Sequence, residues 1–250
     1  MELNVGTGEC FTHEYMVDYS DVTSDGRLSP RAAIDCFQNI AILHSNAGGY
    51  TLDWFHDNHC GWILLNWHIV FGEMPFDGAT FTCDTWTSPH KRSQADRDFC
   101  LKDADGKVFA RACSRWVMMD TNKRRPAKLD PDFFSAYLFD EPRPCAEEDY
   151  NMDFPEDAEE ISKMTFPVLR HDTDTNGHAN NAVYIDWALD IIPDELYTVG
   201  NLKELLVSYK KEWRKGDTVC STLFKSDEGL LCLLTNAEDP SVEFGRVIMR

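Results

Sequence analysis

The chain has 250 residues, of which 43% are hydrophobic and 27% charged, and this balance argues against a disordered or fibrous chain. The net charge of −19 disfavours nucleic acid as a partner, because contacts with phosphates need a basic surface. No apolar stretch approaches the roughly 20 residues of a membrane-spanning helix, and no secretory signal is visible at the N-terminus. We therefore expect a soluble, cytoplasmic protein.

The first half of the chain predicts one helix followed by an antiparallel meander. Ser29 and Pro30 supply an N-cap and a proline at the first helical position, apolar residues follow at helical spacing, and Gly48 ends the helix. Four segments rich in aromatic and β-branched residues come next, with Asp-Gly turn signals among them. These predicted strands are Trp62 to Phe71, Ala79 to Thr87, Arg97 to Lys102 and Val108 to Met119.

An acidic segment that contains several prolines follows the meander. Between Asp130 and Glu160 there are twelve acidic residues and one basic residue, Arg143, so more than half of the net charge is concentrated there. The segment has no apolar periodicity. We interpret residues 131–162 as a linker between a domain of residues 1–130 and a domain of residues 163–250.

The second half repeats the order of elements over a shorter length. A strand is predicted around Phe166 to Leu169, and a helix from about Asn180 to Ile191. Four more strands follow, over Glu204 to Arg214, Thr218 to Phe224, Leu230 to Thr235 and Val242 to Met249. Two short matches recur in the same order: Gly78-Ala79-Thr80 with Gly216-Asp217-Thr218, and Phe109-Ala110-Arg111 with Phe244-Gly245-Arg246. Both a duplicated sheet around a helix and two unrelated α+β domains fit these residues.

The most informative stretch is the polar loop from His171 to Asn181, just before the second helix. It places carboxylates, an amide and imidazoles at a helix N-terminus. Free backbone N–H groups and the helix dipole stabilise negative charge there, including an oxyanion that develops on a thioester carbonyl. A catalytic site is therefore one interpretation of this loop.

Three other interpretations fit parts of the same loop. Asp, Asn and His are common capping and turn residues, so one alternative is that the loop has no role beyond starting the helix. The spacing from Asp172 to Gly177 matches the opening of an EF-hand calcium loop, but the twelfth position, which should be a glutamate, is Val183. A transition-metal site is a third alternative, with His171, Asp174 and His178 as the ligands. No HExxH motif or cysteine pair supports it. We expect no metal and no cofactor.

The loop resembles the Asp-x-Asn-x-His motif of the acyl-ACP thioesterase family of plants and bacteria. The motif falls on Asp174, Asn176 and His178, and Glu212 ends a stretch, Tyr209 to Glu212, that is similar to the family's strand with a functional glutamate. The motif is followed, as in the family, by Asn180-Asn181 and Tyr184. Similar segments of the first half, in the family's order, are Gly61-Trp62-Ile63, Asp84-Thr85-Trp86, Arg97-Asp98-Phe99, and Ser114 to Asp120 followed by Arg124-Arg125-Pro126.

The resemblance implies an α+β fold of two tandem hotdog domains, each an antiparallel sheet wrapped around a long helix. It implies a hydrolase of fatty acid biosynthesis that cleaves the thioester of fatty acyl-ACP and releases free fatty acid and holo-ACP. Acyl carrier protein is then the partner, and the chain is a monomer or a homodimer. The alternatives are an acyl-CoA thioesterase of the same fold and a catalytically silent acyl-binding protein. The first hotdog would shape the acyl pocket, with Phe37, Trp62, Leu64 and Trp67 as candidate lining residues.

The resemblance also assigns the catalytic residues. Glu212 or Asp174 accepts the proton of an activated water, and helix N-terminal amides near Asn180 and Asn181 hold the oxyanion. Asn176 orients the water or the thioester, and His178 polarises or protonates a reacting group. The predicted catalytic residues are Asp174, Asn176, His178 and Glu212.

One residue departs from the family pattern. A cysteine follows the functional glutamate in plant members and has been discussed as a nucleophile, whereas Trp213 stands there in this chain. Because an indole cannot perform thiol chemistry, hydrolysis here should use water directly.

Docking of acyl carrier protein, which is acidic, requires a local basic surface. Three clusters are candidates: Lys91-Arg92, Lys123-Arg124-Arg125 with Lys128, and Lys210-Lys211 with Arg214-Lys215.

Overall fold

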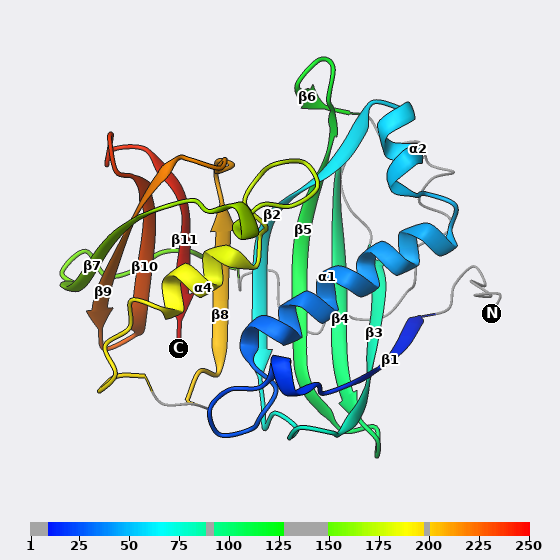
Figure 1. Ribbon diagram of the computed structural model, residues 1–250, viewed down its shortest axis with the longest axis horizontal. Coiled ribbons are helices and arrows are strands. Elements are labelled where there is room, and N and C mark those ends of the chain that lie inside the picture. The colour runs from blue at the N-terminus through cyan, green and yellow to red at the C-terminus, as the bar shows by residue number, and fades with distance from the viewer. Residues whose placement is uncertain (1–9, 89–92, 128–149, 198–200) are drawn as a thin grey trace. The chain divides into compact units, whose positions relative to one another are not determined.

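The computed structural model describes residues 10–88, 93–127, 150–197 and 201–250. Within these ranges the chain divides into two compact units: residues 10–65 and 71–127 form the first, and Asn66–Val70 with residues 150–250 form the second. Each unit pairs a largely antiparallel sheet with a helix on one face (Figure 1). Most of the predicted linker, residues 131–162, lies outside the described residues. The predicted boundaries at residues 130 and 163 stay a prediction.

The first unit is built around helix α1 (Pro30–Ala47). Ser29 caps the helix, since its Oγ accepts a hydrogen bond from the backbone N–H of Ala32 at 3.1 Å, and Pro30 occupies the first helical position as predicted. The helix lies against β1 and β3 and buries Phe37, whose ring centroid is 5.1 Å from that of Phe99. The strands follow the order β1-β3-β4-β5-β2, with β6 beside β5. Their bounds, with those of two short helices, are β1 (Phe11–Met16), η1 (Tyr19–Asp21), α2 (Leu52–Asp57), β2 (Cys60–Phe71), β3 (Thr80–Ser88), β4 (Gln94–Asp103), β5 (Val108–Asp120) and β6 (Arg125–Pro126).

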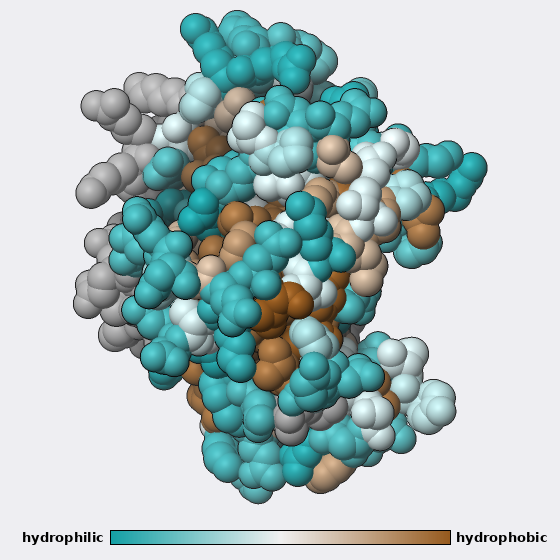
Figure 2. All heavy atoms as spheres, turned by 90° about the vertical axis from the view of Figure 1, so that its left-hand side faces the viewer, coloured by the Kyte–Doolittle hydropathy of each residue, from teal (hydrophilic) through white to brown (hydrophobic). Residues whose placement is uncertain are grey.

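The second unit has the same design with a shorter helix. Its strand order is β8-β11-β10-β9-β7, and Asn66–Val70 of β2 pairs antiparallel with β8. Helix α4 (Val183–Leu189) contacts β9, β10 and β11 and buries Tyr184, Ile185 and Trp187. The other elements are β7 (Glu159–Pro167), η3 (Arg170–Asp172), β8 (Glu204–Tyr209), β9 (Thr218–Ser226), β10 (Gly229–Asn236) and β11 (Glu243–Met249). On the face seen in Figure 2, hydrophilic residues predominate and hydrophobic ones gather near the middle.

The strand predictions were correct for the first meander and wrong at several places in the second half. The strand predicted over Glu204 to Arg214 ends at Tyr209, because the N–H groups of Lys210 and Lys211 both donate to the carbonyl of Phe244 and break the ladder. The predicted helix begins at Val183, and the strand predicted around Phe166 runs over Glu159–Pro167. That strand is at the edge of the sheet and mostly exposed, so it lacks the apolar alternation of a buried strand. The sequence analysis missed β1 and α2.

Backbone hydrogen bonds show that the two units repeat one arrangement. Val17 exchanges two bonds of 2.9 Å with Gly78–Ala79, and Val168 exchanges two bonds of 3.1 and 2.9 Å with Gly216–Asp217. The short glycine match in the sequence therefore marks the same turn in both units. Of the two interpretations left open by the residues, the duplicated sheet around a helix is correct.

The first unit also contains a buried histidine. His44, in the last turn of α1, is 1% exposed, and its Nδ1 lies 3.0 Å from Nη1 of Arg97. Burial, with a further contribution from the Arg97 charge, lowers the pKa of His44 from 6.5 to about 3. Between these pH values the unfolded chain binds a proton that the folded chain does not. The free energy of unfolding therefore falls as the pH falls through this window, by up to about 1.4 kcal/mol per pH unit.

We expect His44→Gln to flatten the pH dependence of the free energy of unfolding between pH 6.5 and about 3, measured by urea denaturation. Above pH 6.5 the histidine is neutral in both states, so its titration no longer affects stability. His56→Gln is the control, because the side chain of His56 is 87% exposed. A His44→Gln slope equal to that of the wild type would contradict the assignment.

Candidate active site

The four predicted catalytic residues lie on two segments of the second unit. Asp174, Asn176 and His178 are in the loop between η3 and α4, and Glu212 is in the irregular segment after β8. The loop is exposed at Asp174 and Asn176 and half-buried at His178. The site therefore depends on how the loop is shaped and how it is fixed to the segment after β8.

Asp174 shapes the loop. Its Oδ1 accepts hydrogen bonds from the backbone N–H groups of Asn176 at 2.8 Å and His178 at 3.2 Å. Its own N–H donates to the carbonyl of His178 at 2.8 Å. Gly177 closes the turn at φ +76°, a conformation that glycine adopts without strain. The carboxylate of Asp174 is thus engaged in presenting His178.

The loop is joined directly to the segment that carries Glu212. The N–H of Ala179 donates to the carbonyl of Trp213 at 2.9 Å, and His178 forms an isolated β-bridge with Arg214. As a result, Nε2 of His178 lies 3.4 Å from Oε2 of Glu212. The side chains of the two residues are 24% and 48% exposed, so this imidazole–carboxylate pair is open to solvent.

The structure thus separates the predicted residues into two pairs. His178 and Glu212 face each other, whereas Asn176 donates from Nδ2 to Oδ2 of Asp174 at 3.4 Å. Between the two candidate bases, the geometry places Glu212 beside the imidazole and Asp174 within the loop.

Some of the backbone amides that were expected to bind the oxyanion already donate hydrogen bonds within the protein. The N–H of Asn180 donates to the carbonyl of Asp172 at 2.8 Å, and the N–H of Ala182 donates to Oδ1 of Asn180 at 2.9 Å. The helix begins later than predicted, and the amide of Asn180 itself closes the preceding turn. The assignment of the oxyanion to amides near Asn180 and Asn181 stays a prediction.

The equivalent loop of the first unit has the same backbone and different chemistry. The N–H of Thr23 donates to the carbonyl of Arg27 at 2.8 Å, as Asp174 does to His178. Arg27, which stands in the place of His178, donates to the carbonyl of Met74 at 2.7 Å, lies 4.1 Å from the centroid of Phe76 and pairs with Glu73 at 3.3 Å. The prediction that this stretch is only a turn is consistent with this arrangement, because it lacks an imidazole–carboxylate pair.

Trp213 points away from the candidate pair. It is fully buried, and its ring is stacked on that of Phe244 at a centroid distance of 3.8 Å. The neighbouring side chain of Glu212 is 48% exposed, while that of Trp213 fills the core.

Sequence reasoning missed the structural part played by two tyrosines beside the site. Tyr184, on α4, donates to the carbonyl of Lys211 at 2.9 Å, and Tyr209, at the end of β8, donates to the carbonyl of Asn181 at 2.8 Å. Tyr184 was noted only as part of the family motif. No periodicity or spacing signals that its hydroxyl reaches the segment of Glu212.

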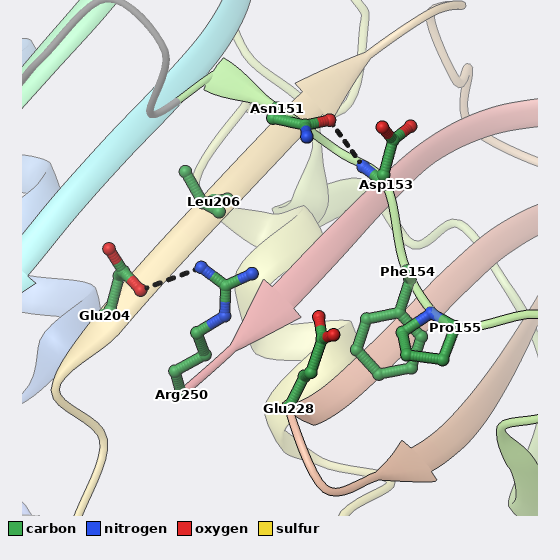
Figure 3. A pocket seen from close by; sticks show the side chains of 8 residues that line it. All are labelled: Asn151, Asp153, Phe154, Pro155, Glu204, Leu206, Glu228 and Arg250. Carbon is green, nitrogen blue, oxygen red and sulfur yellow. Dashed lines mark hydrogen bonds and ion pairs between the residues drawn. The ribbon is translucent and has the colours of Figure 1, made fainter.

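A pocket of about 470 Å³ lies elsewhere on the second unit (Figure 3). It contains the carboxylates of Asp153, Glu204 and Glu228 and the guanidinium of Arg250. This guanidinium pairs with Glu204 at 3.1 Å. Its charged lining is unlike a surface for an acyl chain. Its lining residues are Asn151, Asp153, Phe154, Pro155, Glu204, Leu206, Glu228 and Arg250.

In the part of the chain that the structure describes, no three His, Cys, Asp or Glu side chains are placed to hold a metal ion. None of the helices described is long and apolar enough to cross a membrane.

Two units in one chain, each a sheet with a helix on one face, define a tandem hotdog protein. The loop before the helix of the second unit carries His178, which pairs with Glu212. The family model described as the acyl-ACP thioesterase N-terminal domain matches residues 8–137, and the model of the C-terminal domain matches residues 155–245. The chain belongs to the acyl-ACP thioesterase family.

Individual relatives agree with this assignment. Oleoyl-acyl carrier protein thioesterase 1, chloroplastic, of Arabidopsis thaliana is 28% identical over 88% of this chain, which spans 65% of the length of that relative. The crystal structure of an acyl-ACP thioesterase from Bacteroides thetaiotaomicron has a TM-score of 0.82 and 26% identity, and the match covers 96% of this chain and 98% of the other. The 12:0-ACP thioesterase from Umbellularia californica, at 18% identity and 96% coverage of both chains, shares the fold with a TM-score of 0.85.

Proposed function

We propose that this protein hydrolyses the thioester of a fatty acyl chain carried on acyl carrier protein, releasing free fatty acid and holo-ACP. The observation that carries the proposal is the pair of His178, on the loop before α4, and Glu212, in the segment after β8, which lie 3.4 Å apart. An imidazole and a carboxylate in contact can accept and return a proton, which thioester hydrolysis requires. Fatty acid biosynthesis is the process in which such a substrate arises.

In the proposed reaction, the pair transfers a proton from water to the leaving thiolate. The Glu212–His178 pair takes a proton from a water molecule, and the water oxygen bonds to the carbonyl carbon of the thioester. The carbon–sulfur bond then breaks, and the sulfur leaves as a thiolate that receives the proton from the pair. Asn176 orients the water or the thioester through its amide, and Asp174 holds the loop through the two N–H bonds that it accepts.

Water is the proposed nucleophile because Trp213 stands where plant members of the family carry a cysteine. Position 213 is a buried tryptophan, which cannot form an acyl-enzyme. Burst kinetics with accumulation of an acylated protein are therefore not expected.

The role of the first unit remains part of the proposal. Its suggested task is to shape the acyl pocket. Of the residues predicted to line that pocket, Phe37 and Leu64 are buried and Trp62 is partly buried. Trp67, the fourth, is fully buried and belongs to the Asn66–Val70 segment of the second unit. The cytoplasmic location and the state as monomer or homodimer also stay predictions.

The test is release of free fatty acid from a panel of acyl-ACPs and the matching acyl-CoAs. Faster hydrolysis of the ACP thioesters supports the proposal. Preference for CoA would keep the chemistry and change the carrier. Binding of acyl-ACP without hydrolysis of either substrate would instead support a silent acyl-binding protein.

A basic surface beside the pair supports the carrier assignment. Lys211, Arg214 and Lys215 are exposed, flank Glu212 and form no ion pair with a described residue. Lys210, the fourth residue of this cluster, is paired with Glu243 at 2.8 Å. Among the other candidates, Lys123 is paired with Asp120 at 2.9 Å, Arg124 and Arg125 are exposed, and Lys91, Arg92 and Lys128 lie outside the described residues. In a chain of net charge −19, three exposed cations beside Glu212 suit an acidic partner.

We expect the triple change Lys211→Glu, Arg214→Glu and Lys215→Glu to raise KM for acyl-ACP on the order of tenfold at low salt, because encounter with an acidic carrier is slowed. KM for a short acyl-pantetheine thioester should change little. Steady-state kinetics with both substrates measure the difference. A triple reversal at Lys107, Lys163 and Lys225, which are also exposed, matches the change in net charge. Equal effects on both substrates, or equal effects of the two triple variants, would reject this surface.

A further inference from the structure

The two members of the candidate pair come from different elements of the second unit. His178 precedes α4, and Glu212 follows β8. Their separation of 3.4 Å depends on the direct backbone contacts of Ala179 with Trp213 and of His178 with Arg214, and also on what fixes the start of α4 to the end of β8. Small changes in such a distance matter, since a misplacement of about 1 Å can cost about 100-fold in rate.

Two tyrosine hydroxyls connect these elements in opposite directions. Tyr184, in the first turn of α4, donates to the carbonyl of Lys211, the residue before Glu212, at 2.9 Å. Tyr209, the last residue of β8, donates to the carbonyl of Asn181, three residues after His178, at 2.8 Å. The helix thus holds the segment of the carboxylate, and the strand holds the segment of the imidazole.

The tyrosine rings are themselves fixed. They pack edge to face with centroids 4.9 Å apart, and Tyr184 is 2% exposed. Burial raises the pKa of Tyr184 far above its ordinary value, so its hydroxyl keeps its proton and remains a donor. A Cβ at Gly245 would lie 3.2 Å from the ring of Tyr184 and 2.9 Å from the carbonyl oxygen of Ser208, so the ring fits only against a glycine.

Both backbone polar groups of Lys211 are hydrogen-bonded, and they belong to the two peptides that flank this residue. Its N–H donates to the carbonyl of Phe244 at 3.0 Å, and its carbonyl accepts from Tyr184. The orientation of the peptide that contains this carbonyl determines where the next residue, Glu212, begins. Losing the Tyr184 hydroxyl removes the hydrogen bond to this peptide and leaves the fold's apolar packing in place.

We propose that Tyr184 and Tyr209 are positioning residues that set the separation of His178 and Glu212. This inference rests on the proposed function, because it assigns the two hydroxyls a purpose in the same reaction. Both hydroxyls are bonded to backbone carbonyls. They act through the backbone of the two segments that carry the pair.

The test uses Tyr184→Phe, Tyr209→Phe and the double variant in the full chain, with acyl-ACP as substrate. We expect kcat to fall about tenfold in each single variant and further in the double variant, with KM within about twofold of the wild type. Tyr15→Phe is the matched control, because the Tyr15 hydroxyl is also buried and has no hydrogen-bond partner among the described residues. It should leave kcat unchanged.

A second readout does not depend on activity. The imidazole NMR resonances of His178 should shift in both single variants and stay in place in Tyr15→Phe. Unchanged kcat and unchanged His178 resonances in the double variant would overturn the proposal, as would a parallel loss in the control. If the wild type hydrolyses no thioester, the proposed function fails, and the His178 resonances alone then decide whether the tyrosines position the pair.

Discussion

Replacing His178 by alanine is expected to lower kcat for acyl-ACP hydrolysis by about 100-fold or more, with the protein still folded. Its Nε2 lies 3.4 Å from Glu212, and no other imidazole is bonded to that carboxylate in the described residues. Glu212→Gln should cause a loss of the same order, because an amide keeps the shape of the side chain and cannot accept the proton. Rates of fatty acid release at saturating acyl-ACP measure both effects.

His171→Ala is the matched control for this loss. His171 belongs to the same polar loop, but its side chain is 80% exposed and its Nε2 pairs with Asp172 at 3.3 Å. Its removal should leave kcat near the wild-type value. Near-normal turnover of both His178→Ala and Glu212→Gln would refute the site assignment.

One further substitution in the same series distinguishes Asp174 from Glu212 as the base. An asparagine at position 174 keeps an oxygen that can accept the N–H bonds of Asn176 and His178, which are 2.8 and 3.2 Å long. If Asp174 only holds the loop, Asp174→Asn retains most of kcat, whereas Asp174→Ala loses it. A loss in Asp174→Asn as large as that in Glu212→Gln would instead make Asp174 the base.

The second large effect concerns stability. Trp213→Ala is expected to lower the free energy of unfolding of the second unit by about 3–5 kcal/mol, because it leaves a cavity in a closely packed core. Trp213 is fully buried, stacked on Phe244 at 3.8 Å and edge-on to Trp187 at 6.4 Å. Its Nε1 has no acceptor among the described residues, so the loss comes from packing. Urea denaturation followed by far-UV circular dichroism measures it.

Two comparisons make this result specific. Trp213→Phe should cost less, since a phenyl ring keeps the stack on Phe244. Tyr19→Ala, at a residue that is 86% exposed, should change the free energy of unfolding by no more than about 0.5 kcal/mol. A loss below about 1 kcal/mol in Trp213→Ala would show that the core around Phe244 does not depend on the indole.

The two units illustrate how one backbone can carry different chemistry. Both loops have the same hydrogen-bonded turn, yet the first presents Arg27, fixed by Glu73 and Phe76, and the second presents His178 beside Glu212. A guanidinium keeps its proton at any physiological pH, so it cannot serve as a base. Only the second loop is therefore equipped for proton transfer.

Much of the fold could be predicted because its signals are local. The start of α1 follows from the cap at Ser29 and from Pro30, and the first meander follows from runs of β-branched and aromatic residues between Asp-Gly turns. The edge strand β1 escaped prediction, and β7 was predicted with the wrong bounds, because both strands pair on one side only and carry polar residues.

The sequence by itself determined the cap of α1, most of the strands and the types of residue in the loop from Asp174 to His178, since these depend on neighbours within a few positions. Only the tertiary structure decided that Glu212 faces His178, that β8 ends at Tyr209 and that Asn66–Val70 pairs with β8. These contacts join segments far apart in the chain. They form through hydrogen bonds and packing that local periodicity does not encode, and it is the folded sheet that brings the groups together.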